Sequence, residues 1–214
     1  MSSVPPDLVL FDLDGTLSDP LEGIGRSINH ALAHFGYAER PLDALAWCIG
    51  PPLVDSFPVL AGRDDPAHTE ALIDKYRERY GSVGYAENLL YPGIAGLLER
   101  LSGAGVPMAL CTSKRADFAE RILEHFGLRA HFRFISGGSG TPKWQQMGAL
   151  RERGLVSERS LMVGDRSFDM VAAHRNGLTA AGVLWGYGSA QELAAEAPRH
   201  LCATPAELGA VILG

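Results

Sequence analysis

Long apolar runs, basic tracts and closely spaced cysteines are all missing from this sequence. No stretch approaches the ~20 consecutive apolar residues that a membrane-spanning helix needs, so we expect no membrane partner. A formal net charge of −6 offers no basic surface for a nucleic acid or an anionic lipid, so we expect neither. Cys48, Cys111 and Cys202 stand far apart, without CxxC or histidine-rich neighbours, which indicates reduced thiols rather than disulfides or zinc ligands.

The length and composition indicate one globular domain with a smaller domain inserted into it. The 214 residues are many for one average domain of ~100–150 residues and few for two. The apolar share of 46% and the charged share of 21% exclude a disordered or fibrous chain. The first residues lack the basic segment of a secretory signal, so we expect a cytoplasmic protein. The sequence carries no signal of an oligomeric state.

Short apolar runs alternate with helical patterns along most of the chain. Residues 94–105 and 116–128 have helical spacing and contain a glycine near the end, where helices commonly stop. This alternation predicts an α/β fold, a Rossmann-like parallel sheet with helical crossovers. The runs that we expect to form its strands are 8–13, 107–112, 132–136, 160–164, 180–185 and the weaker 200–203.

Residues 18–86 interrupt this alternation. They hold helical patterns at 24–36 and 68–81 but no convincing strand, and they separate the first two strands far more widely than the ~2–6 residues usual in α/β units. The pattern predicts a small helical domain inserted at 18–86 into a core made of 1–17 and 87–214. The insert has ten acidic against six basic residues, so it does not favour a polyanionic partner.

Polar residues gather where the predicted strands end. Ligands bind beyond the carboxyl ends of parallel strands, so these residues are candidates for one site. They are Asp12 and Asp14 after the first strand, Thr112, Ser113 and Lys114 after the second, Lys143 after the third, and Asp165 and Asp169 after the fourth.

The chemistry of these residues indicates a cation and a phosphoryl group. Asp12 and Asp14 are two positions apart on an extended chain, so both side chains should point to one face. Two carboxylates so close repel each other unless a cation joins them, and Mg²⁺ prefers such oxygen ligands, with Asp165 as a further one. Lys143 adds a positive charge suited to a phosphoryl group, Thr112 adds a hydroxyl, and a carboxylate nucleophile forms an aspartyl-phosphate.

The four clusters resemble the four motifs of the haloacid dehalogenase-like superfamily. The likeness rests on DLDGTL at 12–17, on TSKRADFAERILEHFGL at 112–128 and on GDRSFDMVAAHRNG at 164–177, and it covers residues 7 to about 194. The segments IGPPLVDSF, LYPGI and GVLWGYGSAQEL resemble its phosphoglycolate phosphatase-like branch, whose core carries a helical cap after the first strand.

The resemblance implies a role for each candidate residue. Asp12 would be the nucleophile and Asp14 the general acid and base, while Thr112, Ser113 and Lys143 would bind phosphate. Asp12, the Asp14 carbonyl and Asp165 would hold Mg²⁺, supported by Asp169. Lys143 has unusual neighbours for the family in Thr141, Pro142 and Trp144, so Lys114 competes for its role.

The function implied is a Mg²⁺-dependent phosphatase that acts on a small phosphorylated metabolite. Within the superfamily, GVLWGYGSAQEL also resembles members described as 5′-nucleotidases, and a sugar phosphomutase would use the same acids. Dehalogenation is disfavoured because it needs neither Asp14 nor a metal. A non-catalytic receiver-type module is disfavoured because it needs no helical insert and no second acid to protonate a leaving group.

Overall fold

The chain folds into two compact units. The computed structural model describes residues 5–138 and 140–214. One unit, which we call the core unit, comprises Met1–Ser18 and Leu90–Gly214; the other, which we call the insert, comprises Asp19–Leu89. The sequence analysis expected the insert at 18–86.

The core unit contains a six-stranded parallel sheet in the order β5-β4-β1-β6-β7-β8. All six predicted apolar runs contribute to it, so the predicted α/β fold class is confirmed. β1 lies at the centre, and its three residues are fully buried, as a strand covered on both faces must be. The strands are β1 (Val9–Phe11), β4 (Met108–Thr112), β5 (Phe132–Gly137), β6 (Leu161–Gly164), β7 (Thr179–Val183) and β8 (His200–Cys202).

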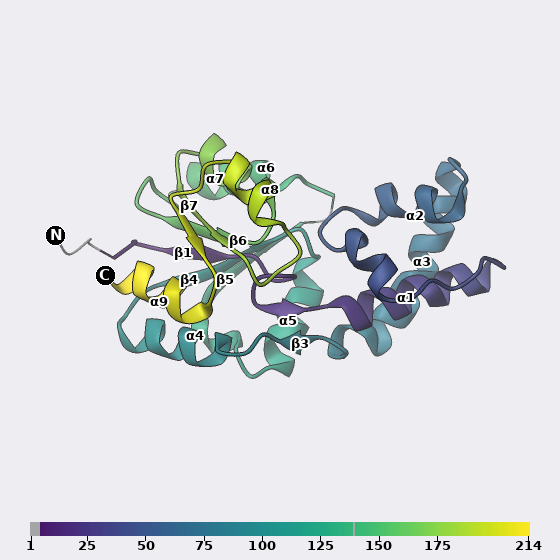
Figure 1. The fold of residues 1–214 in the computed structure, drawn as a ribbon, viewed down its shortest axis with the longest axis horizontal. Helices are drawn as coiled ribbons and strands as arrows, with labels where there is room; N and C mark the ends of the chain where they lie inside the picture. Colours follow the sequence, from purple (N-terminus) through teal and green to yellow (C-terminus); the bar gives the residue numbers. More distant parts are fainter. Residues whose placement is uncertain (1–4, 139) are drawn as a thin grey trace. The chain divides into compact units, whose positions relative to one another are not determined.

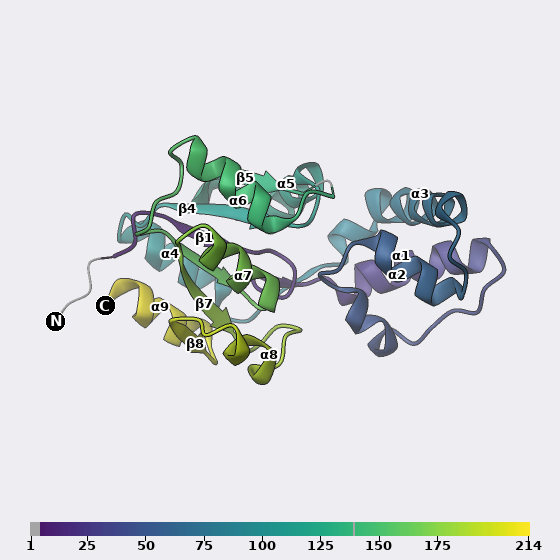
Figure 2. The same cartoon turned by 90° about the horizontal axis from the view of Figure 1, so that it is seen from above.

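Helices cover both faces of this sheet (Figures 1 and 2). α6 and α7 pack against each other on one face, and α4 and α5 lie on the other, where α9 packs on α4. The bounds are α4 (Ile94–Gly103), α5 (Ala116–His125), η3 (Arg129–His131), α6 (Lys143–Glu152), α7 (Ser167–Arg175), α8 (Ala190–Ala195) and α9 (Pro205–Leu213).

The end of β7 differs from the sequence-based expectation. The apolar run at 180–185 predicted that Leu184 and Trp185 continue the strand, but the strand stops at Val183. The Trp185 indole instead donates a hydrogen bond to the Thr16 carbonyl oxygen at 2.9 Å. This bond joins the chain after β7 to the loop after β1. The hydrophobic periodicity of the sequence cannot predict a bond between residues so far apart.

The insert is helical, as expected. α1 packs along α3, and α2 packs on α3, around a core that includes Ile28, Leu72 and the stacked rings of Tyr76 and Tyr80. α3 begins where the Asp65 carboxylate accepts hydrogen bonds from two backbone amides of the first turn, ahead of a proline. The elements are α1 (Leu21–His34), η1 (Asp43–Cys48), α2 (Leu53–Ala61), α3 (Pro66–Ser82) and η2 (Gly84–Ala86).

A pair of two-residue strands marks the boundary between the units. β2 (Ser18–Asp19) and β3 (Leu89–Leu90) pair with each other at the two places where the chain passes from one unit to the other. Two residues are too few to show a strand periodicity, which is why the sequence did not predict them. None of the helices in the described part of the chain is both long and apolar enough to cross a membrane.

Candidate active site

The predicted site residues in the core unit come together at the carboxyl ends of its central strands. Asp12 follows β1, Thr112 ends β4, Asp165 follows β6, Lys143 begins α6 and Asp169 lies in the first turn of α7. The parallel sheet puts β1 between β4 and β6, so residues about 150 positions apart in sequence become neighbours. The topology expected from the sequence therefore assembles the site.

Three buried carboxylates form the centre of the site. Oxygens of Asp12, Asp165 and Asp169 all lie within 4.8 Å of one another. Asp165 and Asp169 are completely buried, and Asp12 is 5% exposed. Burial, and then repulsion from Asp169 and Asp12, raise the pKa of Asp165 to about 7. Burial and repulsion from Asp12 also raise the pKa of Asp169, although Lys143 opposes this.

Lys143 lies between two of these carboxylates. Its Nζ is 3.0 Å from Asp12 Oδ1 and also donates a hydrogen bond to Asp169 Oδ1. Burial opposes the charge of this lysine, which is only 4% exposed, but Asp12 and Asp169 outweigh burial and hold its pKa above the ordinary value. The Phe168 ring lies 5.8 Å from the ammonium nitrogen. Lys143 is therefore a fixed positive charge beside Asp12.

Asp14 is paired with a different lysine. Its Oδ2 is 2.9 Å from Lys114 Nζ, and its side chain is 14% exposed. Burial raises the pKa of Asp14, while Lys114 lowers it. The Asp14 carboxylate does not belong to the group of Asp12, Asp165 and Asp169. The two lysines that competed in the sequence analysis thus have different partners, Lys143 with Asp12 and Lys114 with Asp14.

Hydrogen-bond donors from two distant segments hold Asp165. The Thr16 hydroxyl donates to Asp165 Oδ1 at 3.0 Å, and the Tyr187 backbone amide donates to Oδ2 at 2.8 Å. Gly15 has φ +83°, and a Cβ there would lie 2.2 Å from Asp165 Oδ2. Only glycine can adopt this positive φ without strain and also leave room for the Asp165 carboxylate. The turn after β1 is thus built closely around the Asp165 carboxylate.

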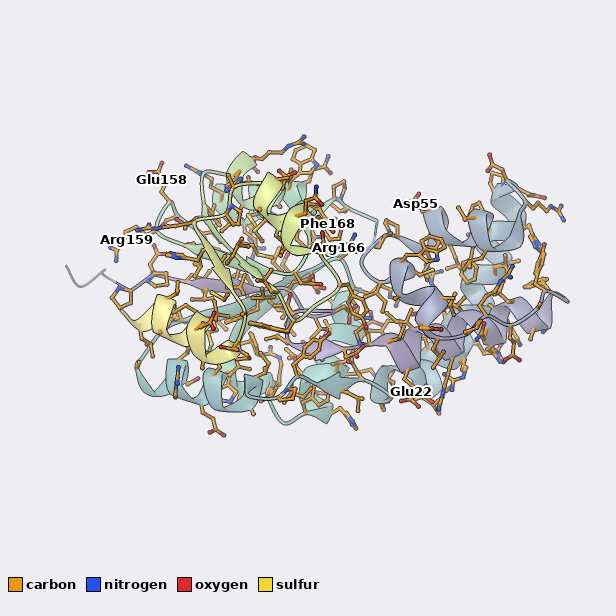
Figure 3. All side chains as sticks on the ribbon, in the orientation of Figure 1. Glu22, Asp55, Glu158, Arg159, Arg166 and Phe168 are labelled. Carbon is orange, nitrogen blue, oxygen red and sulfur yellow. The ribbon has the colours of Figure 1, made fainter. Side chains whose placement is uncertain are left out.

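The first turn of α7 fixes Asp169. Asp169 Oδ2 accepts a hydrogen bond from the Arg166 backbone amide at 3.1 Å, in a capping box at the start of the helix. The Arg166 guanidinium donates to Glu192 Oε1 of α8 at 3.0 Å and lies over the Phe168 ring. Both Arg166 and Phe168 are labelled in Figure 3, beside α8. Asp169 is therefore held on both oxygens, by Arg166 and by Lys143.

Thr112 and Ser113 continue the site from the end of β4. Thr112 is 1% exposed, and its Oγ1 accepts a hydrogen bond from the Lys114 backbone amide at 3.3 Å. Ser113 is exposed at the start of the turn that leads into α5. The Gly138 amide donates to the Thr112 carbonyl at 2.9 Å, which joins this turn to the chain after β5.

The donor set fits a hard divalent cation. Among residues 5–138 and 140–214, no group donates a hydrogen bond to the buried atoms Asp12 Oδ1 and Asp14 Oδ1. Two lysine ammonium groups face four carboxylates at the site, so the ionised carboxylates exceed the positive charges by two. Carboxylate oxygens are the ligands that Mg²⁺ takes in proteins, and one divalent ion would balance the excess charge.

The sequence analysis did not predict which residues hydrogen-bond to the carboxylates. Thr16 and Gly15 lie inside the DLDGTL segment, next to the acids that were noticed, and Tyr187 lies in GYGS. Both segments contain glycine and follow an apolar run, and this was the only sign in the sequence that they belong to the site. The pattern does not predict that both segments donate hydrogen bonds to Asp165.

Replacing Lys143 should lower the stability of the core unit. Lys143→Met leaves Asp12 and Asp169 buried beside each other without their shared cation, and breaking a buried ion pair costs about 3–5 kcal/mol. Urea unfolding without divalent ions would measure the loss. Lys75→Met is the matched control, because the Lys75–Glu78 pair is exposed and should matter little. Equal, small effects of both variants would show that the buried charges are balanced in another way.

Comparison with known proteins places these residues in a family. Residues 9–183 match the family model described as haloacid dehalogenase-like hydrolase. A 5′-nucleotidase of Pseudomonas aeruginosa is 44% identical over 209 residues, 95% of this chain and 94% of that protein. The tyrosine-protein kinase PtkA of Mycobacterium tuberculosis is 41% identical over 190 residues, 86% of this chain; the chain spans 64% of that protein's length.

Further relatives agree with the branch that the sequence motifs indicated. Phosphoglycolate phosphatase 1 of P. aeruginosa is 32% identical over 90% of this chain and 75% of that protein. A crystal structure described as a predicted phosphatase from Clostridium acetobutylicum has a TM-score of 0.90 at 35% identity and covers 98% of this chain and 99% of that one. The resemblance drawn from the sequence is confirmed.

Proposed function

The chain belongs to the haloacid dehalogenase-like hydrolase family, and from that premise we propose that it is a Mg²⁺-dependent phosphatase that works through an aspartyl-phosphate on Asp12. The observation that carries this proposal is the buried group of Asp12, Asp165 and Asp169 with Lys143 among them. An excess of buried negative charge beside a fixed ammonium suits a divalent cation and a phosphoryl group together.

Asp12 is the nucleophile in this proposal. The other two acids of the group each hold two hydrogen-bond donors, Asp165 from Thr16 and Tyr187, and Asp169 from Arg166 and Lys143. Asp12 Oδ1 accepts no hydrogen bond from the described residues, and Lys143 lies 3.0 Å away. Asp12 therefore has one ionic neighbour where each of the other two acids has two hydrogen-bond donors, and the same ammonium can neutralise charge on the phosphoryl oxygens.

Asp14 and Thr112 complete the reaction. Asp14 gives a proton to the departing alkoxide when Asp12 attacks, and later takes one from the water that hydrolyses the aspartyl-phosphate. The Lys114 ammonium, 2.9 Å from its carboxylate, holds this side chain in place. Thr112, with the backbone amides that follow it, would bind phosphoryl oxygens, and Ser113 would contribute to the same turn.

Asp12, Asp165 and the Asp14 carbonyl would hold Mg²⁺, with Asp169 as support. When bound, the ion would neutralise the carboxylates and polarise the phosphoryl group. The chain's own contribution is to hold Asp165 and Asp169 rigidly through backbone amides, Thr16 and Lys143.

Binding of Mg²⁺ should be visible without any turnover. At ten times its dissociation constant, a ligand stabilises the folded state by about 1.4 kcal/mol, which for a chain of this size raises Tm by about 3–6 °C. We expect Mg²⁺ to raise Tm of the wild type by this amount and to do so much less in Asp165→Asn. Phosphate release should stop in excess chelator and return with added Mg²⁺. Full activity in chelator would remove the ion from the proposal.

The substrate class that we propose is a small phosphate monoester, and nucleoside 5′-monophosphates come first. The relative named 5′-nucleotidase is 44% identical over 95% of this chain, whereas phosphoglycolate phosphatase 1 is 32% identical over 90%. A panel of nucleoside 5′-monophosphates, phosphoglycolate and hexose phosphates would test this by release of inorganic phosphate. The highest kcat/KM on a nucleotide is the expected result; the highest on phosphoglycolate would place the enzyme with the other relatives.

The same panel separates hydrolysis from mutase chemistry. A phosphatase releases inorganic phosphate from every accepted ester, while a sugar phosphomutase returns the phosphoryl group and yields an isomeric hexose phosphate.

We also propose that the enzyme works in the cytoplasm, because Cys48, Cys111 and Cys202 are buried free thiols, which suits a reducing compartment.

A further inference from the structure

The chain that follows β7 is packed against Asp165. Residues 185–188, which we call the Trp185 loop, leave the sheet after Val183 and lead toward α8. The Tyr187 amide in this loop donates to Asp165 Oδ2 at 2.8 Å. The Trp185 indole nitrogen donates to the Thr16 carbonyl oxygen at 2.9 Å, and the Thr16 hydroxyl in turn donates to Asp165 Oδ1 at 3.0 Å.

Two glycines allow this close approach. A Cβ at Gly188 would lie 1.9 Å from the Asp165 carbonyl oxygen, and a Cβ at Gly186 would lie 2.2 Å from the Gly15 carbonyl oxygen and 2.4 Å from Asp165 Cβ. All three distances are far inside van der Waals contact, so no side chain fits at either position while Asp165 stays where it is. The close packing against Asp165 therefore explains why both glycines of Trp-Gly-Tyr-Gly lack a side chain.

We propose that the Trp185 loop positions the Asp165 carboxylate for the metal ion, with Trp185 as a positioning residue that acts through Thr16. The inference rests on the proposed function, because it assigns Asp165 to Mg²⁺. Each carboxylate oxygen takes one donor, Oδ1 from the loop after β1 and Oδ2 from the Trp185 loop. The indole bond joins these two loops, so it fixes both donors relative to each other and selects one orientation of the carboxylate.

Removal of this one bond has a definite consequence. Trp185→Phe keeps an aromatic ring in the same place but removes the N–H donor, which leaves the Thr16 carbonyl without that bond. Groups that orient a metal ligand from outside typically change metal affinity by about 10–100-fold when they are replaced. Because Trp185 acts through Thr16, we expect the lower end, a Mg²⁺ affinity weakened by about tenfold.

The test is a Mg²⁺ titration of the whole chain, in which changes of the backbone amide shifts in ¹⁵N–¹H spectra measure binding. Tm is also recorded for each metal-free protein. The variants are Trp185→Phe, Thr16→Val, which removes the hydroxyl bond to Asp165, and Thr16→Ser, which keeps it. Trp47→Phe in the insert is the matched control, since it makes the same replacement at an exposed tryptophan.

Each outcome decides a different question. We expect weaker Mg²⁺ binding in Trp185→Phe and Thr16→Val, and affinities near the wild type in Thr16→Ser and Trp47→Phe. Unchanged Mg²⁺ affinity in Trp185→Phe, whether or not its metal-free Tm falls, would overturn the positioning role and leave Trp185 as a packing residue. Absence of Mg²⁺-dependent shifts in the wild type would instead contradict the proposed function. If Trp185→Phe does not fold, the two Thr16 variants decide whether the donors to Asp165 set the Mg²⁺ affinity. Equal affinities in Thr16→Val and Thr16→Ser would then overturn the proposal.

Discussion

Asp12→Asn should reduce phosphate release to less than about one ten-thousandth of the wild-type rate, the scale on which loss of a covalent nucleophile is measured. The amide keeps the shape of the side chain but has no nucleophilic carboxylate oxygen. Lys143 keeps Asp169 as its partner in this variant, so the fold should persist. A steady-state assay under saturating Mg²⁺ and substrate measures the loss, and Tm confirms that the protein is folded.

A matched control separates this effect from the mere loss of a negative charge. Asp117→Asn removes an exposed carboxylate that pairs with Arg115 in the same unit, and its rate should stay near that of the wild type. If Asp12→Asn kept more than a few per cent of the rate, another group would be the nucleophile. Deamidation of the new side chain is checked by the mass of the assayed protein.

Asp14→Asn should separate the two half-reactions by the leaving group of the substrate. An alkoxide leaving group needs a proton as it departs, so the rate on alkyl phosphates should fall by about 10²–10⁴-fold. p-Nitrophenolate departs without protonation, so the first step on its phosphate ester should slow far less. The second step still lacks its base, and a phospho-enzyme should therefore accumulate. Rapid-quench trapping of labelled protein measures it.

Lys114→Met is the control for Asp14→Asn, because it changes the charge beside Asp14 and keeps the acid. Because Lys114 also holds Asp14 in place, its loss should slow alkyl esters more than nitrophenyl esters, but by less than Asp14→Asn does, since the acid is still present. Equal first-step losses for the two esters in Asp14→Asn, with no trapped intermediate, would contradict the acid and base role. Asp14 would then serve only to order the site.

The fold and the meeting point of the site residues follow from the sequence for a physical reason. Strands buried on both faces need continuous apolar runs, and such runs form the buried strands β1, β4 and β6. A parallel sheet brings the carboxyl ends of its strands to one edge, so the sequence alone predicts that Asp12, Thr112 and Asp165 lie close together.

The partners of each side chain could not be predicted in this way. Thr16 and Asp165 are 149 positions apart, and their hydrogen bond depends on the turn at Gly15 and on the path of the chain after β7. Lys114 and Lys143 both follow strands, and only the geometry assigns one to Asp14 and the other to Asp12. Such assignments depend on distances of a few ångströms, which periodicity does not encode.

The most direct test of the central claim is to find the phosphoryl group on the protein itself. Wild-type enzyme is mixed with Mg²⁺ and a good substrate, quenched in acid within the first turnover, digested and mapped by mass spectrometry. The account predicts one phosphorylated peptide, which spans Asp12, and its absence in Asp12→Asn. A phosphoryl group on another residue, or release of phosphate in the first turnover with no phosphorylated peptide, would contradict it.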